Sequence, residues 1–255
     1  MRLASWNVNS IRVREQSVLD WVRANEPDIL CLQETKVVDD DFPSDELLRL
    51  GYAVAAAGQP SYNGVAIAAR VPLADVRVGL ADDAPGADRR LISASVAGIR
   101  VVNAYVPNGK QVGSASFAEK LRWLSRLRAT LNELYRPDEA LVVCGDFNVA
   151  REERDVYDPA RFRGKIHFHP DERRALADVL DFGLIDGFRH FHDEAGRYSW
   201  WDYRTGGFQK GEGLRIDYAF VTRPLLARCR DVDIDVTPRR GDKPSDHAPV
   251  VMTFE

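Results

Sequence analysis

Leu141-Val142-Val143-Cys144-Gly145-Asp146-Phe147-Asn148 is an apolar run that ends in a glycine, a carboxylate and an amide. It predicts a buried strand that delivers Asp146 and Asn148 to one side of an extended chain. Similar polar groups follow apolar runs in four other stretches: Ser5-Trp6-Asn7-Val8-Asn9, Leu32-Gln33-Glu34-Thr35-Lys36, Arg215-Ile216-Asp217-Tyr218 and Ser245-Asp246-His247-Ala248. Polar groups at strand ends either converge on one site or cap the fold. If they converge, they suit a divalent cation with a histidine beside it, which is the chemistry of phosphate-ester hydrolysis.

The composition predicts one globular domain over residues 1–255. It has 45% hydrophobic and 29% charged residues, as globular proteins do. No apolar run approaches the roughly 20 residues of a membrane span, and a strand at the very start leaves no room for a signal peptide. Three cysteines, an odd number, lie in apolar stretches, which favours free thiols in a reducing cytosol. The net charge of −4 argues only mildly against a nucleic-acid binder, because local basic patches remain.

Predicted strands and helices alternate along the chain with short connections. Helices are expected from Ile11 and after Phe117, with shorter ones at 45–50 and 172–180. Strands are expected at 3–8, 28–32, 52–57, 64–69, 76–79, 91–96, 99–106, 141–144, 198–201, 216–221, 231–236 and 250–254. The five strands between 52 and 106 are predicted to form an antiparallel meander, and 150–170 the longest loop. This order indicates a layered α/β domain in which two sheets pack face to face with helices outside.

Each polar motif has a structural explanation beside the functional one. Glu34 is either a surface carboxylate just past a strand or one of the carboxylates with which proteins bind Mg²⁺. Asn7 is either a satisfied core amide or a group that orients a ligand. Asp146 and Asn148 form either an Asx turn or a pair that holds an attacking water and a phosphoryl oxygen.

Asp217 and His247 form a candidate carboxylate–imidazole pair. Such a pair fixes the imidazole tautomer and supports a positive charge beside a phosphate or a general base; the alternative is a partly exposed histidine at a strand start. Tyr105 and Asn108 end another predicted strand, where they would grip a phosphate or form a plain turn. The other four histidines, at 167, 169, 190 and 192, have no comparable setting and are assigned no role.

In this order, the motifs resemble the signatures of the exonuclease III family of abasic-site endonucleases. The matching residues are Asn7, Gln33-Glu34-Thr35-Lys36, Tyr105 with Pro107 and Gly109, Gly145-Asp146-Phe147-Asn148, Arg215-Ile216-Asp217 and Ser245-Asp246-His247-Ala248-Pro249. The resemblance implies a four-layered α/β sandwich of two mixed sheets flanked by helices. It also implies hydrolysis of the phosphodiester 5′ to abasic sites in duplex DNA, with 3′→5′ exonuclease activity and cleaning of blocked 3′ ends. We expect a cytoplasmic monomer without membrane contact that uses Mg²⁺, for which Mn²⁺ could substitute.

The resemblance also implies roles for the residues around the metal. Glu34 would be the principal Mg²⁺ ligand, with Asn7 and Asp246 close to the metal. Asp146 would orient or deprotonate the attacking water, and Asn148 would hold that water or a phosphate oxygen.

Four further residues are implied to act on the scissile phosphate. Tyr105 and Asn108 would contact it, and His247, oriented by Asp217, would bind a non-bridging oxygen and stabilise the developing charge. Position 9 is Asn where some family members carry Asp, so the surroundings of the metal are expected to be less acidic.

Substrate recognition is implied for a further set of residues. In the family, aromatic and apolar residues at the matching positions wall a small pocket for the flipped-out baseless sugar. Leu214 stands where some relatives carry Trp, which would make the pocket more permissive and favour work at 3′ ends. Alternation along a strand would make one of the two tryptophans an ordinary core residue. The candidates for this pocket and for DNA contacts are Trp200, Trp201, Leu214, Arg215, Ile216, Lys36, Arg90 and the 239–243 loop.

Two other functional classes stay open. One is a phosphatase or phospholipase of the same fold. The 200–204 segment and the lack of a membrane-binding stretch argue against it. The other is a non-catalytic nucleic-acid-binding module, which would tolerate loss of Glu34, Asp146 or His247, whereas all three are present. The catalytic hypothesis requires Glu34 to lie within a side chain's reach of Asp146 and His247.

Overall fold

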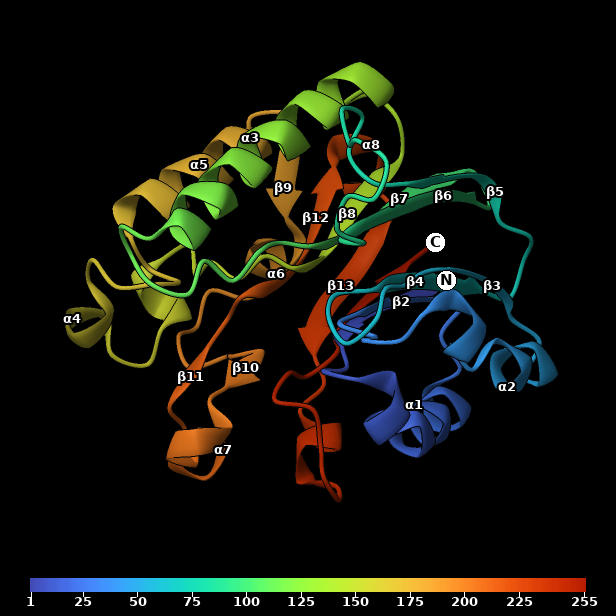
Figure 1. The fold of residues 1–255 in the computed structure, drawn as a ribbon, viewed down its shortest axis with the longest axis horizontal. Helices are drawn as coiled ribbons and strands as arrows, with labels where there is room; N and C mark the ends of the chain where they lie inside the picture. The colour runs from blue at the N-terminus through green and yellow to red at the C-terminus, as the bar shows by residue number, and fades with distance from the viewer.

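Two six-stranded sheets pack face to face, and helices cover their outer faces (Figure 1). This computed structural model describes all residues from 1 to 255. The arrangement confirms the predicted four-layered α/β sandwich. None of its helices is long and apolar enough to cross a membrane.

The first sheet, sheet A, brings both ends of the chain together. β1 lies at its centre, parallel to β2 and antiparallel to β14, the last strand of the chain. This pairing places the motifs near residues 7 and 247 at the same edge. In the order β13-β14-β1-β2-β4-β3, the strands are Cys229–Ile234, Val250–Phe254, Arg2–Asn7, Ile29–Gln33, Val65–Ala69 and Ala53–Ala57.

The second sheet, sheet B, is also mixed, with β7 parallel to β8 and its other pairs antiparallel. In the order β5-β6-β7-β8-β12-β9, its strands are Ala74–Val78, Leu91–Val96, Ile99–Tyr105, Leu141–Asp146, Asp217–Thr222 and Leu184–Asp186. A separate two-stranded sheet pairs β10 (Trp200–Trp201) with β11 (Gly213–Leu214).

Three hydrophobic cores separate the four layers. The largest lies between the sheets and includes Leu3 and Ile29 from sheet A with Val101 and Val142 from sheet B. Sheet B packs against α3 (Ala115–Leu134) and α5 (Pro170–Leu180), which lie side by side in Figure 1. Sheet A packs against α1 (Ile11–Asn25) and α2 (Ser44–Arg49). Central strands such as β2 and β8 are buried along their whole length, which explains why their sequences are almost continuously apolar.

Helix ends follow the capping signals of the sequence. Ser114 precedes α3 and its Oγ accepts a hydrogen bond from Phe117 N (3.1 Å). Glu26 ends α1 in the left-handed conformation and Pro27 follows it. The predicted helix at 172–180 begins two residues earlier, at Pro170, because His169 and Glu172 form a capping box.

The predicted antiparallel meander is wrong as a single unit. The strands β3 and β4 belong to sheet A, while β5, β6 and β7 form a meander in sheet B. The alternation of apolar and polar residues, together with turn residues, locates strands, but it does not indicate which sheet a strand joins. The 150–170 loop contains two short helical segments, Glu153–Asp155 and α4 (Pro159–Phe162).

Several short elements were not predicted. Among them are the strand β9 and the helices α6 (Gly187–Phe191), α7 (Gly207–Lys210) and α8 (Arg223–Leu226). Each has three to five residues, too few to show a helical or strand period.

Candidate active site

The strand ends of sheet A carry one half of the site. Asn7 lies opposite Gln33 in the parallel pair β1–β2, so Asn7 and Glu34 leave the sheet together. The Ser245 hydroxyl donates to Asn7 O (2.7 Å) and anchors the loop that carries His247. Residues 238 positions apart in the sequence therefore become neighbours.

The strand ends of sheet B carry the other half. Tyr105 lies opposite Asp146 in the parallel pair β7–β8, and Asp217 lies opposite Asp146 in the antiparallel pair β12–β8. Gly145 allows this close packing: a Cβ there would lie 1.9 Å from Ala104 O, and its φ of 133° disfavours other residues.

Glu34, Asp146 and His247 converge, with one ligand-type atom of each lying within 4.8 Å of the others. The imidazole of His247 lies between two carboxylates. Its Nδ1 is 2.9 Å from Asp217 Oδ2, and its Nε2 is 3.8 Å from Asp146 Oδ2. The geometric condition set by the catalytic hypothesis is met.

Two amides hold the carboxylates in place. Asn7 Nδ2 donates to Glu34 Oε1 (3.0 Å) and to Asp146 Oδ2 (2.9 Å). Asn148 donates to the Asp146 carboxylate twice, from its backbone N (2.9 Å) and from Nδ2 (3.1 Å). Asn108 Nδ2 in turn donates to Asn148 Oδ1 (3.1 Å). The side chains that were predicted as separate motifs form one hydrogen-bonded unit.

Burial and charge set the protonation of this unit. Burial raises the pKa of Asp146 to about 7, with the Asp217 and Glu34 carboxylates adding to the shift and His247 opposing it. Burial alone would lower the pKa of His247, but the Asp217 and Asp146 carboxylates outweigh it and raise that pKa to about 10. The imidazole is therefore a cation at neutral pH, with a proton on each nitrogen.

Tyr105 and Glu34 respond oppositely to the same surroundings. Burial, together with the Glu34 and Asp146 carboxylates, raises the pKa of Tyr105 well above its ordinary value, so the phenol stays protonated and can donate. Burial would also raise the pKa of Glu34, but Lys36 and the hydrogen bond from Asn7 outweigh it and lower that pKa. Lys36 Nζ lies 2.8 Å from Glu34 Oε2.

The donor set fits a hard divalent cation. Glu34 and Asp146 offer carboxylate oxygens, the ligands that Mg²⁺ and Mn²⁺ prefer. His247 as an imidazolium cannot ligate a metal, but it can donate a hydrogen bond to an anion. The two carboxylates could hold a metal ion with the imidazolium of His247 beside it.

The predicted ligands Asn7 and Asp246 have other partners in the structure. Asn7 directs its Nδ2 at the carboxylates, while its Oδ1 accepts from Asn9 N (2.9 Å). Asp246 accepts from Asn9 Nδ2 (2.9 Å) and Trp200 Nε1 (3.0 Å) and lies outside the three-residue cluster. In this structure both residues hold their neighbours by hydrogen bonds.

Four of the predicted recognition residues lie in the interior. Arg215, Leu214 and Ile216 are at most 1% exposed and Trp201 is 5% exposed. The prediction that Arg215 holds DNA is wrong for this geometry, because Asp155 and Asp186 occupy its guanidinium. Trp201 packs against Phe208, as strand alternation allowed for one of the two tryptophans.

Trp200, Lys36 and Arg90 remain accessible in part. Trp200 lies beside the site, with its ring 6.5 Å from that of His247. The Arg90 guanidinium lies 4.8 Å above the Tyr105 ring and pairs with Asp88 (3.1 Å).

Sequence reasoning missed two buried residues behind the site, His167 and Lys120. His167 Nδ1 lies 2.7 Å from Asn148 O, and its ring is 5.8 Å from that of Trp200. Burial, with the Lys120 ammonium, lowers the pKa of His167 to about 3, so the neutral ring donates from Nδ1 to the carbonyl. A lone histidine in a polar loop carries no local signal of this contact.

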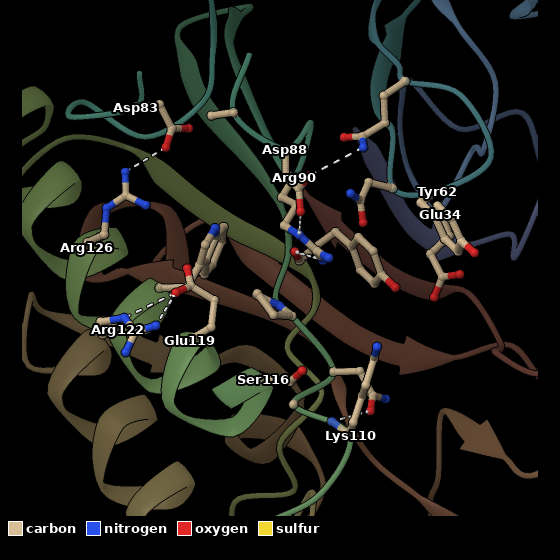
Figure 2. A pocket seen from close by; sticks show the side chains of 18 of the residues that line it. Glu34, Tyr62, Asp83, Asp88, Arg90, Lys110, Ser116, Glu119, Arg122 and Arg126 are labelled. Carbon is tan, nitrogen blue, oxygen red and sulfur yellow. Dashed lines mark hydrogen bonds and ion pairs between the residues drawn. The ribbon is translucent and has the colours of Figure 1, made fainter. Parts of the chain in front are cut away.

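A cleft of about 900 Å³ opens beside the site. Figure 2 shows Glu34 and Tyr62 at one end and Arg122 and Arg126, on α3, at the other, with Arg90 between them. Tyr62 is 70% exposed at its rim. The cleft is long enough to extend from the carboxylate cluster along the first half of α3, and mixed charges line it.

Comparisons with known proteins agree with this geometry. A model of the endonuclease/exonuclease/phosphatase family matches residues 4–247. The chain is 33% identical over 267 residues to an exodeoxyribonuclease III of Haemophilus influenzae, with both chains covered completely. Its fold is similar to that of an AP endonuclease from Archaeoglobus fulgidus (TM-score 0.96, 42% identity, 100% of this chain and 99% of that chain). It is also similar to a 3′ phosphatase, NExo, from Neisseria bound to a product DNA hairpin (TM-score 0.95, 40% identity, 100% and 99%).

Proposed function

The chain belongs to the endonuclease/exonuclease/phosphatase family, and we propose that it is a Mg²⁺-dependent DNA repair nuclease of the exonuclease III type. Its reactions would be hydrolysis of the phosphodiester 5′ to abasic sites and removal of nucleotides and blocking groups from 3′ ends of duplex DNA. The observation that carries the proposal is the convergence of Glu34, Asp146 and a cationic His247 beside an open cleft. The similar exodeoxyribonuclease, AP endonuclease and 3′ phosphatase support the choice of DNA as the substrate.

The site residues divide the work of a phosphoryl transfer. Asp146, with a pKa of about 7, is matched to taking a proton from an attacking water at neutral pH. Asn148, hydrogen-bonded to Asp146, would hold that water in line. His247 would donate from Nε2 to a non-bridging phosphate oxygen, while Asp217 holds Nδ1.

Tyr105 would donate a hydrogen bond from its phenol to one phosphate oxygen, and Asn108 would hold a second oxygen. Glu34 would hold the divalent cation, which leaves Asp146 free to accept the proton of the attacking water. When bound, such a cation supplies Lewis-acid stabilisation of charge on the phosphate oxygens. We expect Mn²⁺ to substitute, because it accepts the same oxygen ligands.

The protein could act mainly at 3′ ends and less at internal abasic sites. The surroundings of Trp200 favour this preference. Leu214 and Ile216 are covered by Val156 and Phe168 in one small apolar cluster, and Trp200 packs on that cluster. The His167 ring lies 5.8 Å from Trp200. A flipped-out sugar would have to enter against these side chains, whereas a terminal 3′-phosphate needs no flipping.

One experiment tests both activities, cleavage at an internal abasic site and reaction at a 3′ end. The protein is incubated with a duplex carrying an internal tetrahydrofuran abasic analogue and with a nicked duplex carrying a 3′-phosphate, in Mg²⁺, Mn²⁺ or EDTA. We expect metal-dependent reaction on both, with the 3′-phosphate favoured, and His167→Ala should raise the ratio of internal nicking to phosphate release. Inertness on both duplexes with release of phosphate from small esters would support the phosphatase alternative and reject the nuclease.

We further propose that residues 1–255 act as one catalytic domain and as a monomer in the cytosol. Site residues from Asn7 to His247 form one hydrogen-bonded unit, which supports a single domain, and the three cysteines are unpaired and buried, as a reducing compartment favours. Sedimentation of the protein with and without duplex DNA checks the monomer.

A further inference from the structure

An ion pair with no solvent exposure lies behind the candidate active site. It joins Lys120 on α3 to Glu172 on α5, and both side chains are 0% exposed. A buried ion pair is seldom more stabilising than well-packed apolar side chains, because the loss of hydration offsets the attraction. Stability alone therefore does not explain why two charges are placed here.

The Lys120 ammonium also binds the two loops that carry asparagines of the site. Its Nζ donates to Asn148 O (2.6 Å) and to Asn108 O (3.2 Å). An ammonium has three donors, so Glu172 and the two carbonyls together use all of them. No apolar residue could reproduce these bonds.

A short chain of hydrogen bonds leads from these carbonyls to the reacting group. The Asn108 and Asn148 side chains are bonded to each other, and Asn148 donates twice to the Asp146 carboxylate. Asn148 has a φ of 54°, a left-handed conformation that persists where surrounding contacts fix it. The Lys120 bond to its carbonyl is one of those contacts.

Glu172 fixes the lysine from the opposite side. While Oε1 pairs with Lys120, its Oε2 accepts from His169 N (3.0 Å) at the start of α5. The pair thus links two helices of the outer layer to both asparagine loops.

We propose that Lys120, held by Glu172, is a positioning residue that sets the place of Asn108 and Asn148 and, through them, the orientation of Asp146. It touches no reacting atom. The proposal rests on the proposed function, because it assigns the reaction to Asp146.

The test is a double-mutant cycle between Lys120→Met and Asn148→Ala, measured as release of phosphate from a nicked duplex carrying a 3′-phosphate in Mg²⁺. We expect Lys120→Met to lower kcat about 100-fold with KM changed less than about threefold, because a displaced Asp146 impairs the reacting geometry more than the binding of DNA. In the Asn148→Ala background the same change should lower kcat by less than about threefold. Equal losses in both backgrounds would overturn the positioning role, and so would a kcat for Lys120→Met close to that of the unaltered protein.

If Lys120→Met does not fold, Glu172→Gln still tests the proposal, because the amide has the size of the carboxylate and keeps a hydrogen-bond acceptor. We expect it to lower kcat less than Lys120→Met does, with the same non-additivity against Asn148→Ala. Arg215→Met is the matched control: it also breaks a buried ion pair, but the Arg215 guanidinium bonds to no residue of the site. Its effect on kcat should be equal in both backgrounds. If the unaltered protein is inert on DNA, the proposed function is rejected. If it is active but the effects of Lys120→Met and Asn148→Ala on kcat are additive, only the inference about Lys120 is rejected.

Discussion

Two clusters of charged residues, joined on the chain at Arg215 and Asp217, shift the pKa of one buried aspartate each in opposite directions. The catalytic cluster contains Glu34, Asp146, Asp217 and His247. The arginine cluster contains Arg151, Asp155, Asp186, Arg189 and Arg215. Burial and neighbouring carboxylates raise the pKa of Asp146 to about 7. Burial would raise the pKa of Asp186 too, but Arg215 and Arg151 outweigh it and lower that pKa.

The balance of charge within each cluster explains the difference. In the arginine cluster three guanidinium groups face two carboxylates, and Arg215 bonds to both aspartates at 2.8 Å. In the catalytic cluster the His247 imidazolium and the Lys36 ammonium face three carboxylates. The arginine cluster has one more positive than negative charge, and it holds the 150–170 segment and β9 against β12. The catalytic cluster has excess negative charge, which a bound cation would compensate.

The substitution Asp146→Asn should have the largest effect. Loss of the proton acceptor should lower kcat for 3′-phosphate release by about a thousandfold or more. The metal-free protein should unfold at the same temperature or higher, because a buried carboxylate with raised pKa is replaced by a neutral amide of the same size. Phosphate release and thermal unfolding in EDTA measure the two effects. A kcat within tenfold of the unaltered protein would remove Asp146 from the mechanism.

The substitution Arg215→Met should give the opposite pattern. Breaking this buried network leaves two aspartates without their main partner, so the free energy of unfolding should fall by about 3–5 kcal/mol. The protein that remains folded should keep most of its kcat. Urea unfolding followed by phosphate release at a temperature well below the transition checks both. A large loss of kcat with unchanged stability would instead assign Arg215 a role in the reaction, and the two clusters would then not differ in function.

A divalent cation should stabilise the protein through the catalytic cluster alone. Mg²⁺ at a hundred times its dissociation constant should raise the free energy of unfolding by about 2.7 kcal/mol. We expect Glu34→Gln to lose this gain and Asp186→Asn to keep it, as judged from unfolding temperatures across a Mg²⁺ titration. Equal gains in both variants would place the cation elsewhere.

The two aspartates should also give opposite, smaller slopes of stability against pH. Asp186 has a folded pKa below the ordinary 3.8, so its contribution is present above about pH 4 and is lost as the pH falls through the folded value. Asp146 has a folded pKa of about 7, so the folded state takes up a proton first and stability rises as the pH falls from 7 towards 4. Asp186→Asn should flatten the acid limb of the stability curve, and Asp146→Asn the limb between pH 4 and 7. Urea midpoints measured in EDTA across this range decide whether the signs differ.

Much of the candidate site could be predicted because its residues stand at the ends of apolar runs. Asp146 ends a strand, Glu34 follows one and Asp217 begins one, and strand ends gather at a sheet edge. The supporting residues had no such signal. Lys120 occupies a position on an amphipathic helix that any long side chain could fill, and His167 lies in a polar loop. Their roles depend on a carbonyl oxygen of Asn148, which no sequence pattern reports.

The sequence by itself determined the layered α/β class, the strand ends that carry carboxylates, and the family to which they belong. These follow from the local spacing of apolar residues and from short motifs, which can be recognised without knowledge of distant contacts. Only the tertiary structure decided that Arg215 supports the interior, that Asp246 binds Asn9 and Trp200, and that Asp146 and Asp186 have opposite pKa shifts. The physical reason is that the pKa and the partner of a buried charge depend on the neighbours that the fold brings to it, whatever their separation along the chain.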